Sequence, residues 1–308
     1  AQDAAISRTG NGFSIQEEQE GSTVDIEKST KALETYLNDK WNHDDFTLET
    51  ALVKEEPEIK AADLESIQDE LGTFSTDAGG GERWKNLETA SGKLNGMIVM
   101  PGKEVSVHDV TAPYDEEHGY VPAGSYENGQ VVDTYGGGIC QVSTTLYNAV
   151  LKAELQVEER HNHSMIVGYV KPSMDAAIAE SAGKDFRFVN NTGYPIYIEG
   201  YTSNKNITFT IYGVETRDPG HVVTYESEVL ETIQPNSETI NQTSSQPIGF
   251  VDVQSAHIGY KARLWKIVTE NGVEVSREQI NSSSYKMVPR TATVGVATND
   301  SNAYNEMQ

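Results

Sequence analysis

The chain has 308 residues, one cysteine, 37% hydrophobic residues and a formal net charge of −24. Its length suggests two or three domains, and its acidity argues against binding to nucleic acid or to an anionic membrane surface. A single cysteine excludes an intrachain disulfide, and no apolar run approaches the roughly 20 residues that a membrane-spanning helix needs. Because the first residues lack the pattern of a signal peptide, the protein is either cytosolic or preceded by a leader or anchor.

The N-terminal part predicts a small α+β segment. Residues 22–39 have the spacing of an amphipathic helix with Asp25 as its N-cap. The alternating residues 46–59 predict a strand that stops at a proline, and residues 60–72 predict a second helix.

The middle of the chain mixes helix and strand signals. Residues 87–113 predict a helix and two short strands, and residues 114–138 form a long loop rich in glycine, tyrosine and acidic residues. A loop of that length in a compact domain is usually functional. A helix is predicted over 140–153, a strand over 159–170 and three antiparallel strands over 184–213.

The C-terminal part changes character. Between residues 218 and 296, short alternating strands rich in Thr, Ser, Val and Tyr predominate, and residues 260–280 predict a hairpin that turns at Asn271 and Gly272. The expected fold class is therefore α+β, with a core of antiparallel strands and a cysteine-bearing helix followed by an elongated all-β domain.

The only cysteine lies at a position that favours chemistry. Cys140 follows Gly136, Gly137 and Gly138, which allow positive φ and close backbone approach, and it opens a predicted helix. Free N–H groups and the positive end of the helix dipole favour the thiolate, which is the nucleophile. The backbone from Ile139 to Gln141, or the Gln141 amide, would stabilise an oxyanion in acyl transfer.

A nucleophilic cysteine also needs a base and a group that orients the base. His161 and His163 lie at the start of the strand predicted after the helix, and Asp185 opens the next strand. We favour His163 as the base because it alternates with Met165 and Val167, which are expected to face the core, while His161 stays an alternative. The order of these groups resembles that of transglutaminase-like and NlpC-type cysteine enzymes.

Each of these residues also has a structural interpretation. A lone cysteine on a helix is commonly a small buried hydrophobe, and Asp185 could serve only as an ion-pair partner of Arg187. Cys140 with the two histidines would supply three zinc ligands, but no fourth is evident, so neither a metal nor a cofactor is predicted.

The segment "GGGICQVSTTLYNAVLKAELQVEERHNHS" (136–164), followed by "GKDFRFVNNTGYPIYI" (183–198), resembles the VanW family. The likeness begins at "LGTFSTDAGGGERWKN" (71–86) and extends to about residue 213. Members are associated with the surface of Gram-positive bacteria and with some glycopeptide-resistance clusters. The resemblance implies an extracellular location at the wall or the outer face of the membrane. It implies peptidoglycan or another wall polymer as partner, with membrane contact only through an N-terminal anchor; it says nothing of oligomeric state.

The flanking parts carry two further resemblances. Residues 12–70 resemble a peptidoglycan-binding segment that precedes this domain in other proteins. Residues 218–296 resemble the five-glycine domain, which is associated with polymers that contain N-acetylglucosamine. The expected organisation is a disordered or truncated lead (1–11), a peptidoglycan-binding α+β segment (12–72), a VanW-like core (73–213), an all-β five-glycine domain (218–296) and a disordered tail (297–308).

Two functions follow from these patterns. In the first, Cys140 attacks an amide of peptidoglycan, His163 transfers the proton, Asp185 holds the imidazole and Gln141 helps to stabilise the oxyanion, with hydrolysis or transpeptidation as the outcome. In the second, the domain binds glycan or peptide without catalysis and Cys140 is structural. The residues expected to contact the substrate or ligand are Tyr135, Gly136, Gly137, Gly138, His161, Arg160 and the loop tyrosines Tyr114, Tyr120 and Tyr126.

Overall fold

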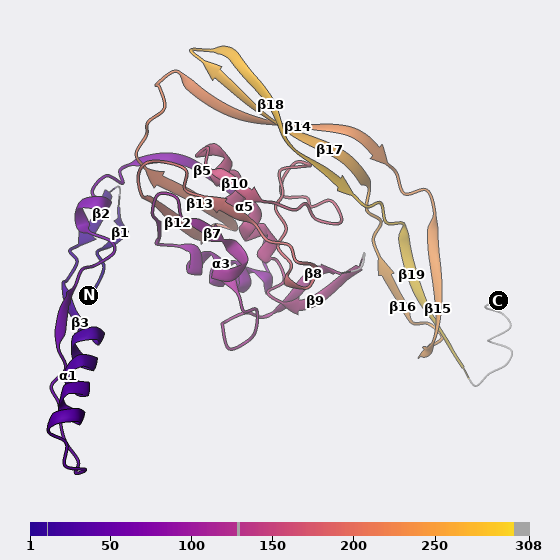
Figure 1. The fold of residues 1–308 in the computed structure, drawn as a ribbon. Helices are drawn as coiled ribbons and strands as arrows, with labels where there is room; N and C mark the ends of the chain where they lie inside the picture. The colour runs from indigo at the N-terminus through magenta and orange to yellow at the C-terminus, as the bar shows by residue number, and fades with distance from the viewer. Residues whose placement is uncertain (11, 128–129, 299–308) are drawn as a thin grey trace. The chain divides into compact units, whose positions relative to one another are not determined.

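The computed structural model describes residues 1–10, 12–127 and 130–298 (Figure 1). The chain divides into two compact units, Ala1–Gln68 and Asp69–Gln308, and each is described by itself. Within the described ranges, no helix combines the length and the apolar character needed to cross a membrane.

The first unit is built from two small antiparallel pairs and two helices. The pairs are β1 (Ala5–Thr9) with β2 (Gly12–Gln16) and β3 (Gly21–Val24) with β4 (Leu52–Glu55), and the helices are α1 (Ile26–Asp39) and α2 (Ala61–Leu64). Helix α1 is confirmed with its predicted cap, since the Asp25 carboxylate accepts the Lys28 N–H at 3.0 Å. The lead expected to be disordered contains strand β1.

Two predicted elements of this unit are wrong in extent. The strand expected over 46–59 is only β4, and the helix expected over 60–72 is only the single turn α2. From Asp69 the chain enters strand β5 (Asp69–Asp77), which pairs with the distant strand Asn206–Gly213. Long-range pairing therefore overrides the local helical spacing.

The first part of the second unit is centred on a four-stranded antiparallel sheet. Its order is β5, β13 (Asn206–Gly213), β12 (Ile196–Ser203) and β6 (Met97–Val99). Helices α3 (Arg83–Leu94) and α5 (Ile139–Lys152) pack on this sheet, and Leu87, Leu146 and Phe209 are fully buried between them.

A second, three-stranded sheet completes this core. Its strand order is β10 (Gln156–Glu159), β11 (Arg187–Val189) and β7 (Glu104–Ser106). The remaining elements of this part are the short helix α4 (Val107–Thr111), the 3₁₀ turn η1 (Glu180–Ala182) and the hairpin of β8 (Pro122–Glu127) and β9 (Gln130–Tyr135). The strand predicted over 159–170 is wrong, because β10 ends at Glu159 and the chain then runs without regular structure. Of the three strands predicted over 184–213, β12 and β13 form a hairpin, whereas β11 lies in this second sheet.

The C-terminal part of the second unit is all β. One antiparallel sheet has the order β14 (His221–Ile233), β17 (Gly259–Glu270) and β18 (Val273–Tyr285), and the other has the order β15 (Glu238–Pro247), β19 (Arg290–Ala297) and β16 (Val251–Gln254), with β15 and β19 parallel. The predicted hairpin turn is confirmed, with φ of 50° at Asn271 and 82° at Gly272.

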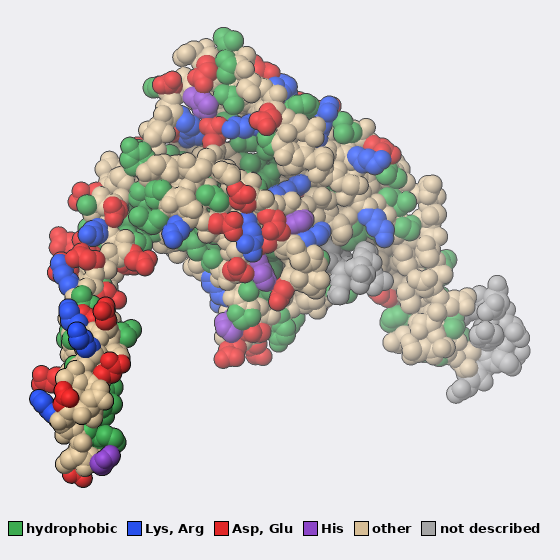
Figure 2. Space-filling view, viewed as in Figure 1, with side chains coloured by type: hydrophobic (Ala, Val, Ile, Leu, Met, Phe, Trp, Pro, Cys, Tyr) green, Lys and Arg blue, Asp and Glu red, His purple; other side chains and the backbone are tan. Residues whose placement is uncertain are grey.

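The broad α+β organisation with a β-rich C-terminal part is confirmed. The surface over β15, β16 and β19 is mostly neither charged nor hydrophobic (Figure 2), as the many Ser, Thr and Asn residues of these strands require. Most of the tail predicted from residue 297 onward lies outside the described residues.

Candidate functional site

The three glycines before Cys140 are needed by the backbone itself. Gly136 and Gly138 have φ of 76° and 99°, values that favour glycine. A Cβ on Gly137 would lie 2.0 Å from the carbonyl oxygen of Ala123 in β8. Gly136 and Gly137 are also buried, so the expectation that they contact a ligand is wrong, and their role is to turn the chain tightly into α5.

Helix α5 is buried almost all round, and its polar side chains bind a loop. Ser143 Oγ donates to the Ala176 carbonyl at 2.5 Å, and Thr144 Oγ1 accepts the Ala176 N–H at 3.0 Å. Asn148 Nδ2 donates to the Met174 carbonyl at 2.8 Å. Because buried polar groups need partners, these positions of the helix fix the loop that follows the histidine pair.

This arrangement brings a thiol, an imidazole and a carboxylate into one chain of contacts. Cys140, the second residue of α5, is half-buried, and its thiol lies close enough to the His163 imidazole for each group to shift the pKa of the other. Cys140 Sγ also lies 3.3 Å from the carbonyl oxygen of Ile178. On the other side of the ring, His163 Nδ1 lies 2.7 Å from Asp175 Oδ2. The Cys–His–Asp order is that of a nucleophile, a base and an orienting acid.

The three groups shift one another's pKa. Burial raises the pKa of the Cys140 thiol, but the hydrogen bond and charge of His163 outweigh burial and hold it below its ordinary value. Burial lowers the pKa of His163, whereas the hydrogen bonds to Asp175 and Cys140 raise it to about 9. Burial raises the pKa of Asp175, but His163 and Arg160 bring it to about 2. Near neutral pH these shifts favour a thiolate beside an imidazolium.

Four donors surround the Asp175 carboxylate. Oδ2 accepts the backbone N–H and the Nδ1 of His163, both at 2.7 Å. Oδ1 accepts Arg160 Nη2 at 2.9 Å and the hydroxyl of Tyr285. The Arg160 side chain is only 7% exposed, so the prediction that Arg160 contacts a ligand is wrong: its charge is used inside the protein to hold this carboxylate.

Asp185, the acid predicted to orient the base, is bound elsewhere. Its carboxylate accepts Ser106 Oγ at 2.6 Å, the His108 N–H at 3.0 Å and the Phe186 N–H at 2.7 Å. It also pairs with Arg187 Nε at 2.9 Å, which is the structural alternative considered for this residue. These contacts hold β11 beside β7 and the start of α4, so the assignment of Asp185 to the imidazole is wrong.

The Gln141 side chain is likewise fully engaged. Its Oε1 accepts Arg83 Nη2 at 2.8 Å, and its Nε2 donates to Thr76 Oγ1 at 2.9 Å and to the Asp77 carbonyl at 2.8 Å. With 1% of its surface exposed, Gln141 ties α5 to β5 and α3. The amide is therefore not free to stabilise an oxyanion, contrary to the prediction.

The first turn of α5 engages two of the backbone donors that were also proposed to stabilise the oxyanion. The N–H groups of Ile139 and Gln141 donate to the carbonyls of Gly136 and Gly138 at 3.0 and 2.8 Å. Arg83 packs against the same turn, since a Cβ on Gly138 would lie 3.1 Å from Arg83 Nε. Within the described part of the chain, this buried Nε has no hydrogen-bond partner.

His161, the alternative base, points to a different group. Its Nε2 lies 2.9 Å from Glu159 Oε1, and its side chain is 40% exposed. His161 is therefore not part of the Cys140–His163 contact. Across the ranges that the structure describes, no three His, Cys, Asp or Glu side chains are grouped so as to hold a metal ion.

The loop tyrosines differ in accessibility. Tyr135 is 43% exposed and available to a ligand, whereas Tyr120 is 1% exposed and donates its hydroxyl to the Thr111 carbonyl. The prediction that Tyr120 contacts a substrate is therefore wrong. Tyr114 is half-buried against Gly136. The side chain of Tyr126 lies outside the described residues.

Sequence reasoning missed Asp175, Tyr169 and Tyr285. Asp175 is the first acidic residue after His163, a signal that sequence order offered. The hydroxyl of Tyr169 lies 3.5 Å from His163 Nε2, and burial holds the pKa of Tyr169 well above its ordinary value. Tyr285 lies 110 residues beyond Asp175, so no local pattern could have linked them.

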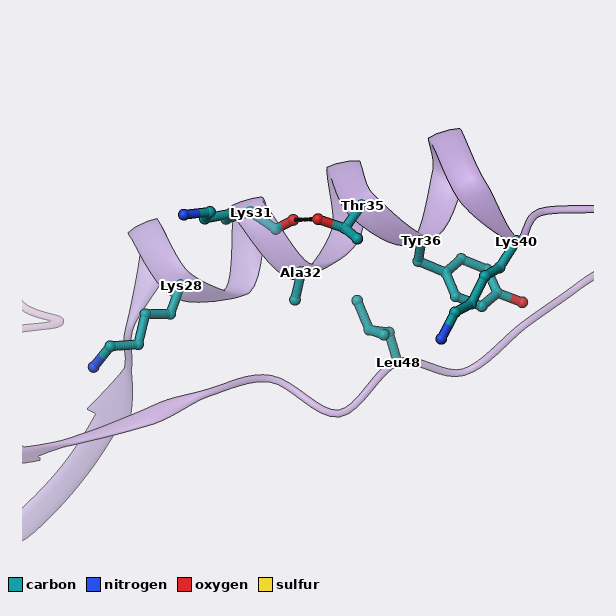
Figure 3. A pocket seen from close by; sticks show the side chains of 7 residues that line it. All are labelled: Lys28, Lys31, Ala32, Thr35, Tyr36, Lys40 and Leu48. Atoms are coloured by element: carbon teal, nitrogen blue, oxygen red, sulfur yellow. Dashed lines mark hydrogen bonds between the residues drawn. The ribbon is translucent and has the colours of Figure 1, made fainter.

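A separate hollow of about 420 Å³ lies on helix α1 in the Ala1–Gln68 unit (Figure 3). Its lining residues are Lys28, Lys31, Ala32, Thr35, Tyr36, Lys40 and Leu48. None of the residues of α1 is buried, and Ile26 at its start is 77% exposed. Three lysines around one hollow stand out in a chain with 47 acidic and 23 basic residues.

Two family models match this chain. Residues 82–212 match the family described as VanW like protein, and residues 224–298 match the G5 domain. Over 145 residues, or 46% of the chain, the sequence is 33% identical to "Uncharacterized protein YoaR" of Bacillus subtilis and covers 48% of that protein. Over 90 residues, or 29% of the chain, it is 29% identical to "Vancomycin B-type resistance protein VanW" of Enterococcus faecalis and covers 32% of it. The chain thus spans about half or less of these curated relatives.

Two solved structures match about a quarter of the chain each. The IgA1 protease G5 domain is 28% identical, with a TM-score of 0.18, and the match covers 25% of this chain and 94% of that one. HP0197-G5 is 18% identical, with a TM-score of 0.14, and the match covers 24% of this chain and 97% of that one. By the two family matches, the chain carries a VanW-like domain over residues 82–212 and a C-terminal G5 domain over residues 224–298.

Proposed function

We propose that the VanW-like domain is a cysteine-dependent acyl-transfer enzyme that acts on the stem peptides or cross-bridges of peptidoglycan. The observation that carries this proposal is the Cys140–His163–Asp175 contact chain, in which the pKa of the thiol is lowered and that of the imidazole is raised. Strongly perturbed groups in mutual contact are typical of catalytic sites. The substrate class rests on the VanW-like and G5 families, both associated with the bacterial cell wall.

The first half-reaction forms a thioester. The Cys140 thiolate attacks the carbonyl carbon of an amide, and the resulting oxyanion collapses as the C–N bond breaks. His163, present as the imidazolium, gives its proton to the leaving amine, and Asp175 keeps the ring oriented with Nδ1 toward itself. The acyl group is then joined to Cys140 through a C–S bond.

The second half-reaction releases the acyl group. Water or the amine of a second peptide attacks the thioester carbonyl, and neutral His163 takes the proton of the attacking group. The C–S bond breaks and the thiolate returns beside the imidazolium. Water gives hydrolysis and an amine gives transpeptidation, through the same residues.

Arg83 is our candidate for stabilising the oxyanion. The amide of Gln141 is already bonded, whereas the buried Arg83 Nε lacks a partner among the described residues and packs against Gly138, two residues before Cys140. A preorganised donor of this kind typically contributes about 10²-fold to 10³-fold in kcat.

The lysine-lined hollow on α1 would serve wall attachment. Lys28, Lys31 and Lys40 line the hollow together with Leu48, and Lys40 lies beside the Tyr36 ring, a combination suited to an anionic polymer with apolar groups. Binding there would support the role of residues 12–72 as a peptidoglycan-binding segment.

Purified muropeptides test the proposal. Wild type, Cys140→Ser and the control Tyr201→Phe, which removes a hydroxyl from an exposed residue of β12, are incubated with them and the products are read by mass spectrometry. We expect wild type and Tyr201→Phe to give cleaved or newly cross-linked peptides that Cys140→Ser does not. Identical traces from all three proteins, across several cross-bridge chemistries, would assign the domain to non-catalytic binding with a structural Cys140.

A further inference from the structure

The end of strand β18 in the G5 domain runs along the site of the VanW-like domain. Asn281, Ser283 and Tyr285 alternate along the strand and therefore point to one face. Ser283 and Tyr285 are 6% and 2% exposed, and all three side chains are bonded to residues of the VanW-like domain.

Tyr285 reaches the acid of the site directly. Its hydroxyl accepts the Ser173 N–H at 2.7 Å and donates to Asp175 Oδ1. Because a hydroxyl has a single proton and an ionised carboxylate only accepts, the direction of both bonds is fixed. The G5 domain thus supplies one of the four donors to Asp175.

The same strand holds the loop that carries the acid. Ser173 has φ of 68°, a left-handed conformation that is rare for a residue other than glycine. Its N–H is bonded to Tyr285, and its carbonyl accepts Asn281 Nδ2 at 3.1 Å. Both backbone groups of this residue are therefore held by the G5 domain, two positions before Asp175.

A third contact joins β18 to Arg160, the second cationic residue that pairs with Asp175. Arg160 Nη1 donates to Ser283 Oγ at 2.9 Å, while Nη2 of the same guanidinium binds Asp175 Oδ1. The interface continues along the segment that bears His163, where the Asn162 side-chain amide donates to the Ser284 carbonyl and the Ser164 carbonyl accepts the Lys286 N–H. Asp175 and Arg160 are thus both bonded to the same end of β18.

We propose that Tyr285 is a positioning residue of the acyl-transfer site and that the seated G5 domain is required to set Asp175 against His163. This inference rests on the proposed function of Cys140 and His163. It makes the G5 domain part of the catalytic unit, so a change in how β18 is seated changes the reactivity of Cys140.

Alkylation of Cys140 by iodoacetamide in the full chain tests the inference without a substrate. The chain has one cysteine, so the label reports one thiol. We expect Tyr285→Phe to slow alkylation at pH 7 by about threefold to tenfold. This is less than the roughly tenfold to hundredfold value of one hydrogen bond to a charged group, because the loss reaches Cys140 only through Asp175 and His163. Tyr201→Phe, with its 46% exposed tyrosine, is the matched control and should alkylate like wild type.

A double-mutant cycle separates positioning from general destabilisation. If Tyr285 acts through Asp175, Tyr285→Phe has no further effect in an Asp175→Asn background. With muropeptide substrate, Tyr285→Phe lowers kcat and leaves KM unchanged, because the residue does not touch the substrate. Ser283→Ala, read through the same cycle, replaces Tyr285→Phe should the latter fail to fold.

Two results would overturn the inference. One is that Tyr285→Phe alkylates at the wild-type rate, and the other is that Tyr285→Phe slows alkylation equally in the wild-type and Asp175→Asn backgrounds. Failure of the proposed function gives a different result. In that case wild type yields no muropeptide product, while the coupling between Tyr285 and Asp175 is still read from the alkylation rates.

Discussion

His163 Nδ1 lies 2.7 Å from Asp175 Oδ2, and the same oxygen accepts the backbone N–H of His163 at 2.7 Å. One carboxylate oxygen thus fixes both the ring and the backbone of the histidine. This double contact selects the tautomer in which Nε2 is available to Cys140. The carboxylate also stabilises the positive charge of the buried imidazolium.

Replacing Asp175 by Asn should destabilise the protein most in mildly acidic solution. The pKa of His163 is raised from 6.5 to about 9, so its contribution is complete below pH 6.5 and lost as the pH rises through 9. The pKa of Asp175 is lowered from 3.8 to about 2, so its contribution is present above pH 3.8 and lost as the pH falls through 2. Both act fully between pH 3.8 and 6.5.

Urea unfolding checks this expectation. At about pH 5 we expect Asp175→Asn to lower the free energy of unfolding by about 3 kcal/mol, because Arg160 and His163 lose a buried partner. At about pH 9.5 the loss should be clearly smaller. An equal loss at both values would mean that the charge of His163 does not depend on Asp175.

Asp185→Asn should lower the stability of the protein without changing the reactivity of Cys140. The Asp185 carboxylate binds Ser106 and two backbone N–H groups, so its replacement should lower the free energy of unfolding by about 1–3 kcal/mol. It contacts neither Cys140 nor His163 in these bonds, and the alkylation rate of Cys140 should stay at the wild-type value. A slowed alkylation would restore Asp185 to the site.

Gln141→Leu distinguishes a structural amide from a catalytic one. The substitution leaves Arg83, Thr76 and the Asp77 carbonyl without their partner, at a cost of about 2–4 kcal/mol in the free energy of unfolding. The pH profile of Cys140 alkylation in the folded variant should match wild type. A variant of unchanged stability that has lost turnover would instead assign the amide to the oxyanion.

Gly137→Ala tests the reason for the glycine run. The added Cβ would lie 2.0 Å from the carbonyl oxygen of Ala123, so α5 or β8 must move, and we expect a loss of more than about 4 kcal/mol or no folded protein. Gly80→Ala is the control, since nothing lies within 4 Å of its Cβ and its φ is not positive, and its effect should stay within about 0.5 kcal/mol. Thermal unfolding of the two variants gives the comparison.

The sequence was sufficient where a signal was local. The Asp25 cap placed α1, the Asn271–Gly272 turn placed the β17–β18 hairpin, and the motif at Gly138 and Cys140 placed the start of α5. In each case the physical cause, a capping carboxylate or a backbone with positive φ, acts between neighbours in the chain.

The sequence was insufficient where contacts between distant segments determine which residues form the site. Strand order predicts Asp185 as the orienting acid, but His163 is not on a strand, and its N–H binds the loop acid Asp175 instead of a neighbouring strand. The motif also predicts Gln141 and the glycines as site groups, although β5, α3 and β8 need them for packing. Tyr285 belongs to another domain, and no periodicity in the sequence predicts its contact with Asp175.

The pH dependence of Cys140 alkylation tests the central claim most directly. In wild type we expect the rate to rise with an inflection below the free-thiol value of about 8.5, because the thiolate is stabilised by His163. In His163→Gln, which keeps a polar side chain but cannot carry charge, the inflection should return to that value or above. A wild-type inflection near 8.5 that His163→Gln leaves unchanged would contradict an activated thiol at this site.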